Sequence, residues 1–129
     1  MLGALLALLG VMLGAFGAHG LKSMLDTSAL ATFEVGVRYQ MYHSLATLLV
    51  GGLATQASLV WRKRAALLFI IGSVLFSGSI YLLVLTGQKW LGPVTPLGGL
   101  CLMLGWVALV IGVMKGADNG ADTRPGSDD

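Results

Sequence analysis

Two histidines are the side chains of this sequence best suited to chemistry. His19 ends the first apolar run and His43 opens the second, so an antiparallel helix pair would bring both imidazoles to one end. Imidazole titrates near neutral pH and binds metals in its neutral form. Two interpretations stay open: a site for a proton, metal, haem or quinone, or two structural residues that bond helix-end and loop groups. No third ligand has metal-binding spacing, so we predict no metal site and no cofactor.

Further polar side chains lie between the two histidines. Glu34 and Arg38 are four residues apart, Tyr42 follows four residues later, and Tyr39 precedes His43 by four. Residues at this spacing share one face of a helix. The alternative is a solvated Glu34–Arg38 pair worth about 0.3–0.5 kcal/mol on an ordinary surface. The candidate polar cluster consists of His19, Glu34, Arg38, Tyr39, Tyr42 and His43.

Serines in the third apolar run are weaker candidates. Ser77 and Ser79 flank Gly78, and hydroxyls inside apolar helices usually bond to the backbone or to a neighbouring helix. No general base is assigned to either serine. The sequence therefore predicts structural serines and no enzyme activity.

The elements that position these residues are four apolar runs. The chain of 129 residues is 56% hydrophobic and 11% charged, whereas a soluble domain carries about 25% charged residues. The runs are free of Asp, Glu, Lys and Arg, and each approaches the roughly 20 residues that cross a bilayer. They cover residues 2–18, 42–60, 65–85 and 96–114.

This pattern predicts an all-α membrane protein with a four-transmembrane-helix bundle over residues 1–115. Asp26, Thr27 and Ser28 are candidate N-caps for a short amphipathic helix that precedes or joins the second span. Gly87 is a candidate C-cap, and Thr95 with Pro96 a candidate helix start. Residues 116–129 carry no large apolar side chain, which predicts a disordered cytoplasmic tail.

The flanks of the spans predict how the chain inserts. The first run could be a signal peptide, but no Lys or Arg precedes it, which favours a retained span. Arg62, Lys63 and Arg64 form a triplet in the expected second loop. The side that holds this triplet and both termini has five Lys or Arg residues, against three on the other side. The positive-inside rule then places both termini in the cytoplasm.

Small residues recur along three of the spans in steps of three and four. A repeat of 3.5 residues keeps one face of a helix toward a partner, and small side chains let backbones approach in lipid. The alternative is that glycine is simply common in such spans. The expected packing glycines are Gly3, Gly10, Gly14, Gly17, Gly51, Gly98, Gly105 and Gly112.

Several motifs together resemble a known family. They are GAFGAHGL at 14–21, GVRYQMYH at 36–43, FSGSIY at 76–81, TPLGG at 95–99 and GW at 105–106. The chain is similar to the domain of unknown function 423 family, which includes the eukaryotic transmembrane protein 256. The resemblance implies a small multi-pass membrane protein, located in the inner membrane in bacteria. It implies no activity, ligand or catalytic residue.

The function predicted from these features is that of a small interaction or accessory subunit. The expected partners are the lipid bilayer and either a second copy or a larger membrane protein, and the net charge of +2 does not indicate nucleic acid. The alternative is a channel or transporter for a small solute or proton that uses the candidate polar cluster. Transport paths usually carry ionisable groups within the membrane. In this chain His43, at the edge of the second apolar run, is the one candidate for such a group.

Overall fold

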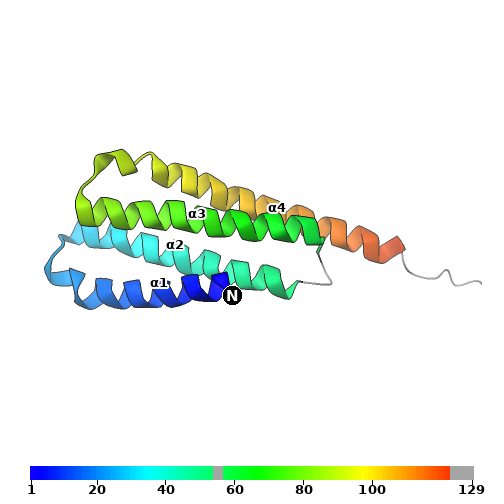
Figure 1. Cartoon of the computed structure of the whole chain (residues 1–129), viewed down its shortest axis with the longest axis horizontal. Helices are drawn as coiled ribbons and strands as arrows, with labels where there is room; N and C mark the ends of the chain where they lie inside the picture. Colours follow the sequence, from blue (N-terminus) through cyan, green and yellow to red (C-terminus); the bar gives the residue numbers. More distant parts are fainter. Residues whose placement is uncertain (54–56, 123–129) are drawn as a thin grey trace, which may run out of the picture.

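The computed structural model describes residues 1–53 and 57–122, with side chains up to Gly116. Over these residues the chain forms four α-helices and two short 3₁₀-helices packed side by side (Figure 1). The α-helices are α1 (Leu2–His19), α2 (Thr27–Gly52), α3 (Leu59–Thr86) and α4 (Val94–Asp122). The 3₁₀-helices η1 (Leu21–Ser23) and η2 (Lys89–Leu91) lie in the α1–α2 and α3–α4 connections.

Helix α2 joins two elements that the sequence suggested. The Asp26 side chain accepts a hydrogen bond from the Ala29 N–H at 2.8 Å, which satisfies a free donor at the helix start. The helix then continues without a break to Gly52. The amphipathic segment and the second apolar run are therefore one helix.

The α2–α3 connection differs from the expected loop. Helix α2 ends at Gly52 instead of residue 60, and α3 already begins at Leu59. The Ser58 N–H donates to the Gly112 carbonyl of α4 at 2.9 Å, which fixes the start of α3. Arg62, Lys63 and Arg64 consequently lie on the first turns of α3 and not in a loop.

In the α3–α4 connection, the end of α3 has the predicted capping residue, whereas the start of α4 differs from the prediction. Gly87 ends α3 in the left-handed conformation with φ 70°, and its N–H donates to the Leu83 carbonyl at 2.9 Å. Helix α4 begins at Val94, one residue before the expected cap, so Pro96 lies in the first turn, where a missing N–H costs no bond. Helix α4 also continues to Asp122, so residues 116–122 are helical where disorder was expected. Residues 123–129 lie outside the described part.

The helices are not equivalent in their packing. Helix α3 packs against α2 and against α4, whereas α1 packs mainly against α2 (Figure 1). The main core lies among α2, α3 and α4 and includes Ala46, Val50, Ala65, Phe69, Leu102, Ala108 and Leu109. Helix α1 is thus a peripheral element of the bundle.

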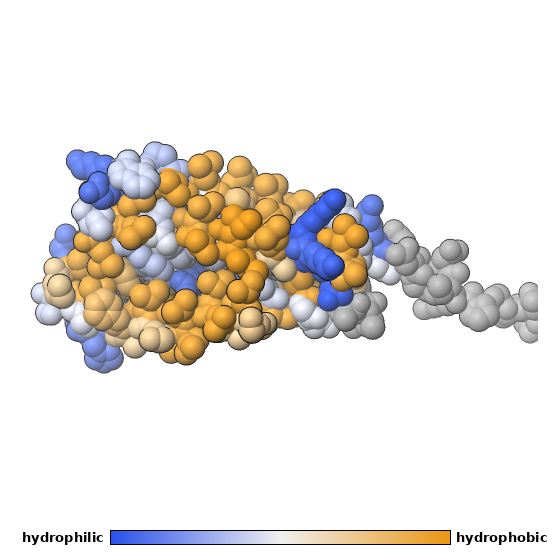
Figure 2. All heavy atoms as spheres, viewed as in Figure 1, coloured by the Kyte–Doolittle hydropathy of each residue, from blue (hydrophilic) through white to orange (hydrophobic). Residues whose placement is uncertain are grey.

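Within residues 1–53 and 57–122, three segments are long and apolar enough to cross a membrane: residues 2–23, 59–86 and 89–116. Helix α2 is not among them, because Glu34, Arg38 and Gln40 lower its hydropathy. In Figure 2, apolar side chains cover the middle of the visible face and hydrophilic ones gather toward its two ends. This distribution is the one that a bilayer-spanning bundle needs.

Candidate functional site

His43 lies in the interior of the bundle with both ring nitrogens bonded. Its side chain is 6% exposed. The Trp106 indole N–H, which can only donate, lies 3.2 Å from Nε2, so Nε2 accepts and Nδ1 carries the proton. Nδ1 then donates to the Tyr39 carbonyl at 2.7 Å. The contacts hold a neutral imidazole in one tautomer and link α2 to α4.

Gln40 is the central polar residue of the bundle. Its amide nitrogen donates to the Leu6 carbonyl at 2.8 Å, and its amide oxygen accepts from the Tyr81 hydroxyl at 2.8 Å. These bonds join α1, α2 and α3 at one point. A buried amide is stable in an apolar interior only when its hydrogen-bonding groups are paired.

The serines of α3 bond across the helices, as the sequence suggested. The Ser77 hydroxyl donates to the Gly36 carbonyl of α2 at 2.7 Å, and the Ser79 and Thr95 hydroxyls are 2.7 Å apart between α3 and α4. Ser73 is different, because its buried hydroxyl oxygen has no partner among the described residues.

The candidate polar cluster is not gathered in one pocket. His19 is exposed at the end of α1, and its Nδ1 lies 3.0 Å from the Ala15 carbonyl, as expected for a helix-end residue. Glu34 and Arg38 line a hollow of about 290 Å³ between α1 and α2 beside Gly14 and Gly17. These two charged side chains, both in the described part, form no ion pair with each other.

The tyrosines of the cluster lie between its exposed and buried members. The rings of Tyr39 and Tyr42 are both exposed, with centroids 6.1 Å apart. The Tyr39 ring also stacks on His43 at 6.1 Å and contacts Phe76 at 4.9 Å. The structure instead connects polar side chains in separate pairs: Gln40 with Tyr81, His43 with Trp106, and Ser79 with Thr95. Residues 1–53 and 57–116 contain no group of three His, Cys, Asp or Glu side chains that could hold a metal.

Gln40 is not among the candidate residues that the sequence predicted. A signal was available in its spacing. Phe33, Gly36, Gln40 and His43 follow steps of three and four and are all buried, so the glutamine belongs to the inward face.

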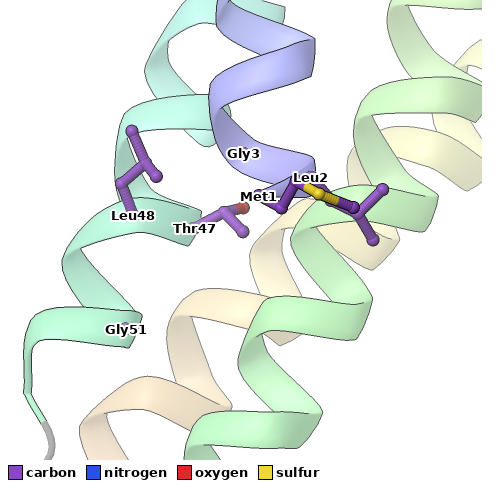
Figure 3. Close-up of a pocket in the computed structure, with 6 residues that line it drawn as sticks. All are labelled: Met1, Leu2, Gly3, Thr47, Leu48 and Gly51. Atoms are coloured by element: carbon purple, nitrogen blue, oxygen red, sulfur yellow. The ribbon is translucent and has the colours of Figure 1, made fainter.

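Most of the expected packing glycines lie at helix contacts. Gly3, Gly10, Gly14 and Gly17 of α1 face α2, and Gly98, Gly105 and Gly112 of α4 face α3. Gly51 differs, because a Cβ added there would meet no atom within 4 Å. Gly51 is exposed in the last turn of α2, where this helix extends beyond the first residues of α1 (Figure 3).

The larger hollows lie between neighbouring helices near the surface. One of about 460 Å³ is lined by Met1, Leu2, Gly3, Thr47, Leu48 and Gly51 (Figure 3). Another of about 320 Å³, the α1–α3 groove, is lined by Leu9, Met12, Gln40, Ser73, Gly78 and Tyr81 among others. Both hollows have mostly apolar walls.

Comparisons with known proteins agree with this architecture. A UPF0382 membrane protein of Staphylococcus aureus is 44% identical over 116 residues, which cover 88% of this chain and 93% of the relative. The UPF0382 membrane protein YwdK of Bacillus subtilis is 44% identical over 115 residues, covering 88% and 94%. A relative from Staphylococcus haemolyticus is 43% identical over 114 residues, with 88% and 93% covered. No solved structure matches the chain.

The family model described as "Protein of unknown function (DUF423)" matches residues 13–99. This range contains the end of α1, all of α2 and α3, and the start of α4. It therefore includes Gln40, His43 and Tyr81, although Trp106 lies beyond it. On the matched range and on the identity to these relatives, the chain belongs to the DUF423 family.

Proposed function

We propose that this chain is an integral membrane protein with four spans that serves as a small interaction or accessory subunit and catalyses no reaction itself. Helix α2 has 26 residues, which at 1.5 Å per residue is about 39 Å and is long enough to span. Its buried polar side chains, Gln40 and His43, have their bonds inside the bundle. Internal pairing of this kind is what makes polar residues tolerable in a membrane helix.

One observation carries the proposed interaction role. The α1–α3 groove is apolar and opens on the side of the bundle. Its lining includes Ser73, whose hydroxyl has no partner among the described residues. Gly78 leaves open space beside it, because an added Cβ would meet nothing within 4 Å. In lipid, helices associate through close fit and weak polar bonds. The groove offers the first of these, an apolar surface with room for close fit, to an apolar helix of a second copy or of another membrane protein.

Cysteine cross-linking tests this role. In a Cys101→Ser background, Gly78→Cys should give a cross-linked species in native membranes, at twice the monomer mass for self-association or at another mass for a partner. Val110→Cys is the matched control, because Val110 is 58% exposed on α4. If the two cysteines cross-link equally, or neither does, the groove is not an interaction surface.

We also propose that both termini face the cytoplasm. The support is the cationic first turn of α3, which lies at the same end of the bundle as the start of α1 (Figure 1). A membrane-impermeant maleimide should label Lys22→Cys in intact cells from which the outer barrier has been removed. It should label Lys63→Cys only after lysis, and the reverse pattern would invert the topology.

The transport alternative depends on His43. Because both of its ring nitrogens are bonded, to Tyr39 and to Trp106, a proton relay through this imidazole would have to break one bond in each cycle. The alternative predicts a pH-dependent flux in liposomes that His43→Ala abolishes. Absence of flux from the wild-type protein over a broad solute panel would leave the interaction role as the better account.

A further inference from the structure

Four cations gather at the end of the bundle where α2 ends and α3 begins. Arg62, Lys63 and Arg64 lie on the first turns of α3, and Lys115 lies on α4. The Arg64 guanidinium carbon is 4.7 Å from the centre of the Trp61 ring, and the Lys115 ammonium is 5.8 Å from the same centre. The ring thus draws cations from two helices to one place.

The charges of Lys63, Arg64 and Lys115 are not neutralised by any carboxylate of the described part. The side chains of Lys63 and Arg64 are also exposed. Arg62 is held by α2, since its Nε donates to the Val50 carbonyl at 3.0 Å. An anion is the chemical complement of such a cluster.

Two mostly apolar hollows lie at this end of the bundle, and Arg62 and Lys63 line the smaller one. One of about 150 Å³ between α2 and α3 is lined by Val50, Gly51, Leu59, Lys63 and Ala66 among others. The second is the 460 Å³ hollow between α1 and α2, which shares Thr47 and Gly51 with the first (Figure 3). Gly51 lines both hollows and fills neither, because a Cβ added there would meet nothing within 4 Å.

We propose that this end of the bundle binds an anionic phospholipid. The phosphate lies against Lys63, with the field of Arg62, Arg64 and Lys115 behind it, and the acyl chains enter the hollows beside Gly51. Free phosphate offers the same anionic chemistry, but apolar walls next to the cations select a molecule with a hydrocarbon part. Trp61 is a residue type that anchors at headgroup level, which places the cations at the depth of lipid phosphates.

The experiment measures lipid binding to the purified full chain in a nonionic detergent by native mass spectrometry. Dioleoylphosphatidylglycerol should bind more tightly than dioleoylphosphatidylcholine. Lys63→Gln should weaken the binding of phosphatidylglycerol by about fivefold, the effect of one cation near an anionic surface. Lys89→Gln is the matched control, because Lys89 is an exposed cation in the α3–α4 connection and should leave the affinity unchanged.

A second variant tests the hollows. Gly51→Leu should weaken phosphatidylglycerol binding while leaving the thermal stability at the wild-type value, since the new side chain enters open space. Equal affinity for the two lipids, or equal effects of Lys63→Gln and Lys89→Gln, would overturn the proposal. Inorganic phosphate that displaces phosphatidylglycerol completely, together with wild-type binding by Gly51→Leu, would also overturn it in favour of a small-anion site. The proposal rests on bilayer insertion and is independent of the cross-linking result at Gly78.

Discussion

Glycines lie at the contacts of both the α3–α4 pair and the α1–α2 pair, but neighbouring atoms lie closer to the glycines in the α3–α4 pair. At α3–α4, a Cβ at Gly98 would overlap the backbone nitrogen of Phe76, and one at Gly105 would lie 2.6 Å from the Phe69 ring. At α1–α2, a Cβ at Gly10 would meet the end of the Met41 side chain at 3.5 Å, an ordinary contact. The first pair needs its glycines sterically, whereas the second tolerates a methyl group at this position.

Helix α1 is also less buried than α3 and α4. Over their most apolar windows, residues 2–23 are 17% buried, and residues 59–86 and 89–116 are 33% buried each. Helix α1 compensates with a polar contact, the bond from Gln40 to the Leu6 carbonyl. Similar stripes of small residues can therefore support a tightly packed helix interface or a looser one that is held by a hydrogen bond.

The largest expected effect is at Gly98. Gly98→Ala should lower the free energy of unfolding in detergent by about 3 kcal/mol, because an overpacked contact against backbone cannot relax by rotating a side chain. Thermal or denaturant titration of the purified protein measures it. Gly99→Ala is the matched control, since its Cβ would meet the Phe76 ring at 3.6 Å or more and should cost little. Equal losses would refute the steric account.

The next largest effect concerns the attachment of α1. Gln40→Leu removes the bonds to the Leu6 carbonyl and the Tyr81 hydroxyl and should cost about 1–2 kcal/mol, in the upper range for polar contacts between membrane helices. Tyr81→Phe should cost less, and the double variant should lose less than the sum of the two single losses. Strict additivity in this cycle would show that the Gln40–Tyr81 bond contributes nothing.

A smaller effect is expected where α2 meets α4. Trp106→Phe keeps an aromatic ring against Phe69 but removes the N–H that His43 accepts. The expected loss is about 0.6–1 kcal/mol, near the mean for such bonds in lipid. Chemical denaturation with near-ultraviolet circular dichroism as the readout measures it. Trp90→Phe is the control, because Trp90 is exposed. If it lowers stability by the same amount, the hydrogen bond does not explain the loss in Trp106→Phe.

The smallest effect sharpens the comparison most directly. Gly10→Ala should change stability by no more than about 0.5 kcal/mol, because the new contact at 3.5 Å is ordinary and alanine is the better helix former. The same thermal measurement applies. A loss as large as that of Gly98→Ala would show that the α1–α2 interface is as intolerant as α3–α4.

Much of this fold follows from the sequence, because apolar runs and small-residue spacing report directly on helices and their contact faces. The helix start at Asp26 and the end at Gly87 could be predicted from local backbone chemistry. The end of α2 could not, because the apolar run continues through Leu53 to Val60 while a long-range bond from Ser58 to Gly112 fixes the start of α3.

The candidate site was less accessible to sequence reasoning. His43 and Glu34 both lie on α2, but only His43 is buried. Which of the two side chains points inward depends on the rotation of α2 about its own axis. The sequence indicates that rotation through Phe33 and Gly36, yet the partner of His43, Trp106, lies 63 residues away. A contact across that separation is decided by the packing of α4, which no local pattern encodes.

The bond from Gln40 to α1 has a consequence for how the chain tolerates substitution. Its acceptor is the backbone carbonyl of residue 6 and not a side chain, so any helix-forming residue at position 6 presents the same oxygen. Position 40 has no such freedom, since few side chains both donate at that distance and accept from Tyr81. A shift of α1 by one residue would carry the carbonyl out of reach. Gln40 therefore sets the register of α1, and it does so without restricting the identity of the residue it holds.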